Sequence, residues 1–161
     1  MENKLFRLLK GQWRWDRVIG NQWTAYGQCT WSEVNKDKDM ERFLYHETGK
    51  LASSKMKQEL DVQKEYYYCL NSAKKAIEVY FCNPDMTMGN LFIQLSFNSQ
   101  STSSNSEPNW PFCSSSTHQC KLDQYDAKFT YDSENKLTIS YTVKGPHKDY
   151  LSVTTYDRIM K

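Results

Sequence analysis

From residue 12 to the end of the chain, apolar and polar side chains alternate in short runs with a period of two. This period places successive side chains on opposite faces of a β-strand, whereas an amphipathic helix needs a period of about 3.6. Short alternating runs separated by turn residues are typical of an antiparallel sheet with one face on a core. No strand-helix-strand pattern is present, so a parallel sheet is not expected.

A single short helix is expected before the strands. Leu5, Phe6, Leu8 and Leu9 have helical spacing, and Gly11 follows them as a stop signal. All segments after Gly11 are interpreted as strands.

The alternating segments predict about nine or ten strands. Gly20 and Asn21 mark a hairpin between the first two, and Gly145 with Pro146 turns the chain before the last. Gly49 is expected to end the third strand. The segment 55–71 is long enough for one bent strand or two. The other expected strands are 12–19, 23–33, 41–48, 77–81, 91–97, 125–131, 137–143 and 149–159.

The polar segment 98–117 interrupts this alternation. It is dominated by Ser, Asn, Thr and Pro, which favours a loop that separates strands rather than domains. Residues 1–161 are therefore expected to form one domain. A sequential meander of this size avoids exposed edges best by closing, so we expect an all-β, antiparallel up-and-down barrel, with a β-sandwich as the alternative.

Charge and cysteine content exclude several classes of protein. The formal net charge is +2 and the basic residues are scattered, so nucleic acid is not an expected partner. No apolar run reaches the length of about 18 residues that a membrane span requires. The cysteines, which are odd in number and lack CxxC spacing, favour reduced thiols and an intracellular location. The cytoplasm is favoured and an organelle remains open, because the first eleven residues are basic and amphipathic.

Two distant residues carry a resemblance to lipocalins. Gly11-Gln12-Trp13 opens the first expected strand, and Arg158 lies near the end of the last. Lipocalins likewise begin with Gly-x-Trp and end with an Arg that covers that Trp. Closure of the barrel would bring the two strands together and place the guanidinium over the indole.

Most of the chain also resembles a family of small uncharacterised domains of unknown function. The resemblance implies a calycin-like barrel, built like lipocalins and fatty-acid-binding proteins, and it supplies no activity. The motifs that carry it are Gly11-x-Trp13 with Arg17, Gly27-x-Cys29-x-Trp31, Tyr45-x-Glu47-x-Gly49-x-Leu51, Glu78-Val79-Tyr80-Phe81, His118-x-Cys120-x2-Asp123-x-Tyr125-Asp126, the run from Gly145 to Tyr150, and Ser152-Val153-Thr154-x-Tyr156-x-Arg158.

Arg17 shares a strand face with Trp13 and Trp15. If that face lies inside the barrel, the guanidinium needs a partner, because an unpaired buried charge is very costly. The candidates for an internal ion pair, which we favour, are Glu47, Glu78 and Asp123. The alternative is that Arg17 binds the acidic head group of a ligand.

His118 and Cys120 have the residue types of a catalytic pair but not the spacing. On a strand they lie about 6–7 Å apart, whereas a working dyad needs hydrogen-bond contact. Together with Asp123 they offer mixed metal ligands without an obvious fourth, so no metal and no cofactor are expected.

Three functions remain open. The favoured one is a non-enzymatic barrel that binds a small apolar or amphipathic ligand. The second is an accessory subunit of a larger assembly, with a filled interior and protein partners. The third is a small enzyme that uses His118, Asp123, Tyr125 and Glu47. The ligand-binding candidates are Arg17, Trp15, Trp31, Glu47, His118, Asp123, Tyr125 and Phe129, and the pair expected to close the barrel is Trp13 and Arg158.

Overall fold

The computed structural model describes residues 1–34, 40–97 and 109–160. It contains one helix and ten strands. Their bounds are α1 Glu2–Leu9, β1 Gly11–Ile19, β2 Trp23–Glu33, β3 Glu41–Ser53, β4 Leu60–Asn71, β5 Ala76–Cys82, β6 Met88–Leu95, β7 Phe112–Cys120, β8 Asp123–Ser133, β9 Lys136–Lys144 and β10 Asp149–Arg158.

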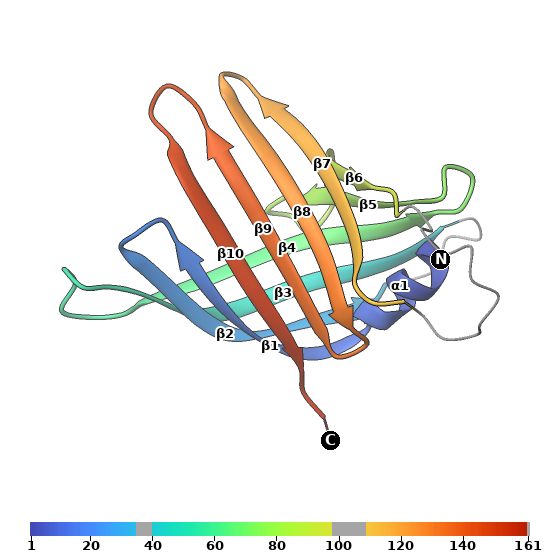
Figure 1. Ribbon diagram of the computed structural model, residues 1–161, viewed down its shortest axis with the longest axis horizontal. Coiled ribbons are helices and arrows are strands. Elements are labelled where there is room, and N and C mark those ends of the chain that lie inside the picture. Colours follow the sequence, from blue (N-terminus) through green and yellow to red (C-terminus); the bar gives the residue numbers. More distant parts are fainter. Residues whose placement is uncertain (35–39, 98–108, 161) are drawn as a thin grey trace.

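All ten strands belong to one antiparallel sheet with the order β6-β5-β4-β3-β2-β1-β10-β9-β8-β7. Each strand pairs with its neighbours in sequence, and β1 pairs in addition with β10, where Trp13 stands opposite Arg158. The sheet curls over on itself, so that β8 to β10 cross the direction of β2 to β4 (Figure 1). The expected antiparallel barrel with adjacent first and last strands is therefore confirmed.

The barrel is nearly closed, and the break lies between β6 and β7. No backbone ladder joins these two strands among the described residues. Serine side chains bridge them instead: Ser114 Oγ donates to the carbonyl of Ser96 at 2.8 Å, and Ser116 Oγ accepts from the Gln94 amide at 3.4 Å.

Strand β7 corrects the predicted loop at 98–117. Residues 112–117 belong to β7, while 98–108 lie outside the described residues. The strand was missed because its inward positions carry Ser114 and Ser116 where other strands carry large apolar residues. These hydroxyls suit a seam position, where they satisfy backbone groups that a ladder would otherwise pair.

Strand β3 also continues beyond its predicted end at Gly49, as far as Ser53. The glycine is explained by packing, because a Cβ at Gly49 would lie only 2.6 Å from Cζ2 of Trp15. The indole of Trp15 therefore lies against the bare backbone of β3.

Helix α1 fills one end of the barrel. Its buried side chains are Leu5, Phe6 and Leu9, and the ring of Phe6 stacks on Phe43 with centroids 4.3 Å apart. Tyr131 in β8 donates a hydrogen bond from its hydroxyl to the carbonyl of Leu5 at 3.3 Å. This amphipathic helix needs the barrel to bury its apolar face, and the barrel needs the helix to exclude water from that end.

Trp13 and Arg158 join the helix to the first and last strands. Trp13 is fully buried, its Nε1 donates to the Leu9 carbonyl at 2.8 Å, and the Arg158 guanidinium lies 4.3 Å from its ring centroid. Arg158 also donates to the carbonyls of Leu8 and Lys10. The predicted cover of Trp13 by Arg158 is confirmed, and the same guanidinium caps the C-terminal carbonyls of α1.

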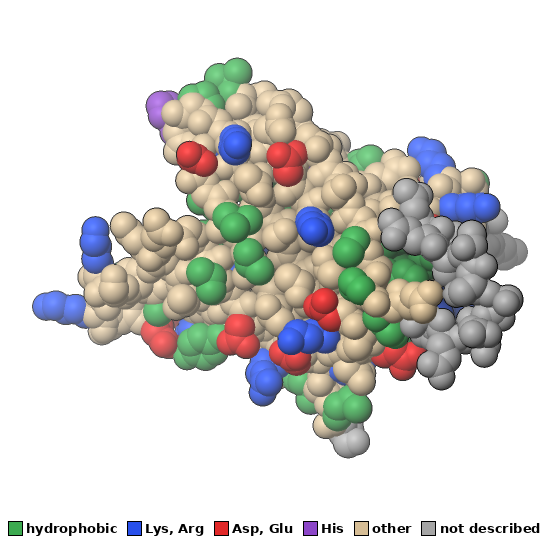
Figure 2. All heavy atoms as spheres, in the orientation of Figure 1, with side chains coloured by type: hydrophobic (Ala, Val, Ile, Leu, Met, Phe, Trp, Pro, Cys, Tyr) green, Lys and Arg blue, Asp and Glu red, His purple; other side chains and the backbone are tan. Residues whose placement is uncertain are grey.

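The outer surface in Figure 2 carries Lys, Arg, Asp and Glu side chains interspersed, without one region of a single sign. None of the described residues form a helix long and apolar enough to cross a membrane.

Replacement of Arg158 by Met should lower the free energy of unfolding by about 2–4 kcal/mol, because it removes the cation–π contact and the charged hydrogen bonds to α1. Urea unfolding measures the loss. Arg14→Met, on the exposed face of β1, is the matched control and should change stability by less than about 0.5 kcal/mol. Equal stability of the two variants would contradict the role assigned to Arg158.

The five cysteines carry free thiols and differ in exposure. We expect alkylation of the native protein to label the exposed Cys113 and Cys120 first. Cys29 and Cys69 should react only after unfolding, because they are buried and burial raises the pKa of each thiol. Mass spectrometry under non-reducing conditions should count five labels in denaturant, and a count of three or fewer would show disulfides.

Candidate functional site

A cavity of about 140 Å³ opens at the mouth of the barrel, at the end of β1 that lies away from α1. A smaller pocket of about 40 Å³ lies beside it and deeper, and the two share five lining residues. Those five are Arg17, Lys64, Tyr66, Tyr141 and Ser152. The remaining residues around the mouth cavity are Ile19, Phe92, Tyr125, Val143 and Tyr150.

A larger hollow of about 590 Å³ lies at the other end, between the start of α1 and Phe97. Its lining stops at Phe97, where the described chain is interrupted. In contrast, all the residues that line the mouth cavity belong to described strands.

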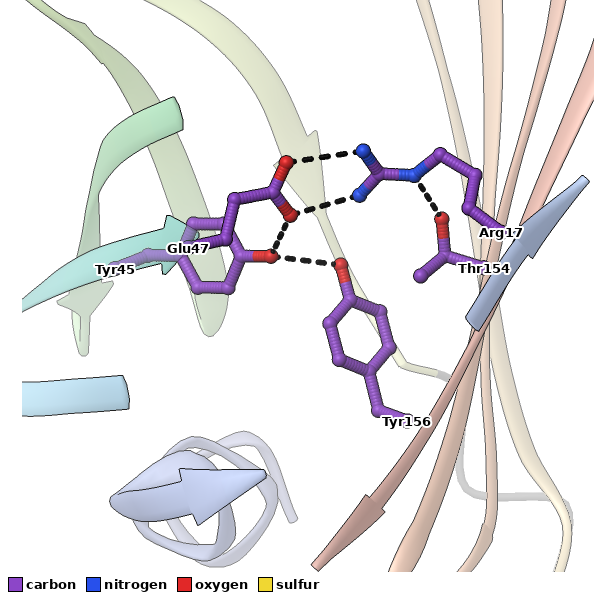
Figure 3. A network of polar contacts seen from close by, with 5 residues as sticks. All are labelled: Arg17, Tyr45, Glu47, Thr154 and Tyr156. Atoms are coloured by element: carbon purple, nitrogen blue, oxygen red, sulfur yellow. Dashed lines mark hydrogen bonds and ion pairs between the residues drawn. The ribbon is translucent and has the colours of Figure 1, made fainter. Parts of the chain in front are cut away.

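The floor of the mouth cavity is a buried ion pair between Arg17 in β1 and Glu47 in β3. Nη1 donates to Oε1 at 2.9 Å and Nη2 to Oε2 at 2.8 Å, and Arg17 Nε donates to Thr154 Oγ1 at 2.7 Å (Figure 3). Glu47 is only 1% exposed. Burial is the largest single influence and lowers the pKa of Arg17, but the hydrogen bond to Glu47 and the electrostatic attraction of Glu47, Tyr45 and Tyr156 together outweigh it and raise the pKa, so the guanidinium stays charged.

Two tyrosines complete this polar network. Tyr45 donates from its hydroxyl to Oε2 of Glu47, and the hydroxyls of Tyr45 and Tyr156 are 3.0 Å apart (Figure 3). Burial raises the pKa of both phenols, so they remain neutral and able to donate. Glu47 therefore accepts three hydrogen bonds, and the network links β1, β3 and β10.

Small residues on β2 make room for the pair. This strand lies between β1 and β3, and its inward side chains at this level are Ala25, Gly27 and Cys29. The Arg17 guanidinium lies 4.5 Å from the ring centroid of Trp15, which spreads over Gly49. The predicted internal ion pair thus exists, and Glu47 is the partner among the three candidates.

The walls of the mouth cavity are aromatic, with Phe92 of β6 at their centre. Its ring stacks on Phe81 with centroids 4.7 Å apart and on Tyr141 at 5.7 Å. It meets Tyr125 edge to face at 6.0 Å and Tyr66 in a tilted arrangement at 6.0 Å. Offset and edge-to-face contacts of this kind hold the rings in fixed positions.

The polar candidates from the sequence are divided between two places. Tyr125 lines the mouth cavity, and Lys148 donates to its hydroxyl at 3.2 Å while forming a salt bridge of 3.0 Å with Asp123. His118 meets the edge of Phe92 at 5.2 Å and is half-buried beside Phe81. Glu47 belongs to the floor. The four residues of the enzyme hypothesis are therefore not gathered around one point.

Three apolar candidates lie in the packed core and not in the cavity lining. Trp15, Trp31 and Phe129 are at most 1% exposed. Trp31 contacts Tyr45, Tyr68 and Tyr156 through its ring. The reason is their position along the barrel axis. These residues lie between α1 and the ion pair, where their large rings pack against one another and fill the interior.

Lys64 is the charged residue among the lining residues that the sequence reasoning missed, which are Ile19, Lys64, Tyr66, Phe92, Tyr141, Val143, Tyr150 and Ser152. It stands directly across from Glu47 in the β3–β4 ladder. Burial of its ammonium by the barrel walls and the nearby Arg17 lower its pKa, although the residue as a whole is exposed at the rim. The signal that could have found it is parity, because Lys64 shares an inward strand face with Tyr66 and Tyr68.

Among the described residues, no three His, Cys, Asp or Glu side chains come together as a metal site. His118, Cys120 and Asp123 therefore do not form the mixed ligand set considered from the sequence.

The fold and the mouth cavity define a calycin-like barrel of the kind that lipocalins share. Residues 9–158 match the family of unknown function DUF6314, and the chain belongs to that family. No curated protein matches the chain in sequence.

Solved structures with the same architecture include the S-type phycobiliprotein lyase CPES from Guillardia theta, with 9% identity and a TM-score of 0.64. The match covers 99% of this chain and 93% of the lyase. The structure of EF1p2_mFAP2b bound to DFHBI matches at 10% identity and a TM-score of 0.48, covering 99% of this chain and 100% of that one. At such low identity the lyase supports the fold alone.

Removal of one partner of the floor ion pair should be costly. We expect Arg17→Met to lower the free energy of unfolding by about 3–5 kcal/mol, because Glu47 is left buried without its counter-charge. The double variant Arg17→Met/Glu47→Met should lose less than the sum of the single losses. Urea unfolding of both, with Arg14→Met as control, measures the coupling. Additive losses would show that the two side chains do not depend on each other.

Proposed function

We propose that this chain is a non-enzymatic barrel that binds a small amphipathic ligand in its mouth cavity. The observation that carries the proposal is the cavity of about 140 Å³ with aromatic walls and a polar floor. Binding sites of small molecules are mostly apolar and carry a few polar groups in fixed positions.

The arrangement favours binding over catalysis because the two carboxylates near the cavity already have partners. Glu47 is committed to Arg17 and Tyr45, and Asp123 is committed to Lys148. A general acid or base must be able to exchange a proton with a substrate, and a carboxylate held by three hydrogen bonds is poorly suited to that.

The packed section near α1 supports the second candidate, an accessory subunit with a filled interior. Trp13, Trp31 and Tyr131 occupy that section and leave no lining for a ligand. The filling stops at the ion pair, however, and the mouth half keeps its cavity. Protein partners in a larger assembly remain the alternative if the cavity binds nothing.

Filling the cavity should abolish binding. Ser152 lines both the mouth cavity and the smaller pocket beside it, so Ser152→Phe places a ring where the ligand would lie. Leu151→Phe is the matched control, because the neighbouring side chain is exposed on the outer face of β10. Thermal shift and protein NMR with a panel of small aromatic acids, fatty acids and neutral aromatics provide the measurement. We expect at least one compound to bind the wild type and Leu151→Phe, and to lose binding in Ser152→Phe.

A panel that gives no shift with the wild type would defeat the ligand-binding function. Binding that survives in Ser152→Phe would place the ligand elsewhere on the protein. In the first case, the accessory-subunit candidate would be the one to pursue.

A further inference from the structure

Lys64 is the cation of the cavity whose charge is not matched. Although it stands directly across from Glu47, both carboxylate oxygens of Glu47 are taken by Arg17, and one of them also by Tyr45. Within the described parts of the chain, the Lys64 ammonium has no hydrogen bond and no salt bridge. The cavity and its floor therefore hold two cations, Arg17 and Lys64, against one anion.

The surroundings of Lys64 disfavour its charged form. Burial by the walls and the neighbouring Arg17 lower the pKa of Lys64, while the attraction of Glu47 only partly opposes them. An anion placed beside the ammonium would stabilise the charged form of Lys64 and raise its pKa. Arg17 cannot fill the same role, since its guanidinium is already bound to Glu47 and Thr154.

The neutral polar groups around Lys64 are phenols that lack protein partners. Among the described residues, the hydroxyls of Tyr66 and Tyr141 make no hydrogen bond, and both residues line the mouth cavity. Burial raises the pKa of both phenols, so each remains a neutral donor. An ammonium with adjacent phenol donors suits the two oxygens of a carboxylate.

The size and walls of the cavity limit the rest of the ligand. An apolar cavity of about 150 Å³ in another protein accommodates benzene, which is close to the volume of about 140 Å³ found here. The rings of Tyr66, Phe92 and Tyr141 present faces and edges against which a flat ring can stack. The cavity is too small to enclose a tetrapyrrole or a folded long-chain fatty acid.

We propose that the mouth cavity binds an aromatic carboxylate of one ring, with its carboxylate on Lys64 and its ring among Tyr66, Phe92 and Tyr141. This inference rests on the proposed ligand-binding function and specifies the charge and the size of the ligand. It assigns to Lys64 the role first considered for Arg17.

Phenylacetate and its neutral counterpart phenylacetamide test the proposal by isothermal titration calorimetry or NMR titration. We expect the wild type to bind phenylacetate about tenfold more tightly, which corresponds to one charged hydrogen-bonded contact of about 1.4 kcal/mol. Lys64→Met should bind the two probes equally. Lys64→Arg should keep the preference for the anion, and Lys128→Met, an exposed lysine on the outer face of β8, should behave as the wild type.

NMR provides a readout that does not depend on the stability of the Lys64 variants. Phenylacetate should shift the ring signals of Tyr66, Phe92 and Tyr141 in the wild type. Equal affinity of the wild type for both probes, or an anion preference that survives in Lys64→Met, would overturn the assignment to Lys64 and leave the ligand-binding function standing. Failure of both probes to bind would overturn the one-ring ligand, and the broader panel with Ser152→Phe then decides whether the barrel binds anything.

Discussion

The pairing of β1 with β10 is the constraint on which the rest of the structure depends. It turns a linear meander into a barrel by joining the two ends of the chain, and Trp13 and Arg158 lie opposite each other in that ladder. The same guanidinium binds carbonyls at the end of α1, so the helix is fixed by the contact that closes the sheet. Arg158, near the C-terminus, thereby holds both the first strand and the helix α1 that precedes it in place.

Closure creates an interior with two different sections. Next to α1, large aromatic residues pack to exclude water, which provides the apolar burial that stabilises a domain of this size. At the level of Arg17 and Glu47 the packing changes from rings to a hydrogen-bonded ion pair. Beyond this pair the walls are aromatic but the centre is open. The ion pair is therefore the boundary between the packed section and the open section of the barrel.

Much of this arrangement could be predicted from local pattern. Alternation identified most strands, Gly-x-Trp with Arg158 identified the closure, and the cost of an unpaired Arg17 predicted an internal partner.

Strand β7 was missed because its inward Ser114 and Ser116 have no apolar periodicity, and their hydroxyls form hydrogen bonds to the β6 segment across the seam. Lys64 escaped because its importance depends on Glu47 being occupied by Arg17, which is a three-strand relation that no local pattern contains. The rings of Trp15, Trp31 and Phe129 were assigned to the right face but their level along the barrel axis depends on register.

Gly49 shows that a residue outside the cavity lining can determine the shape of the cavity. The bare backbone at this position supports the indole of Trp15, and the indole in turn lies beneath the guanidinium of Arg17. A Cβ at position 49 would lie 2.2 Å from the carbonyl oxygen of Tyr26 and 2.6 Å from Cζ2 of Trp15, so a larger residue would have to displace the neighbouring strand, the ring or both, and a displaced ring would move the guanidinium that lies on it. The depth of the cavity thus depends on Gly49, which is not part of its lining, through the indole of Trp15 and the guanidinium of Arg17 that lie between them. In the evolution of such a barrel, position 49 would be expected to tolerate change less than most of the residues that face the cavity.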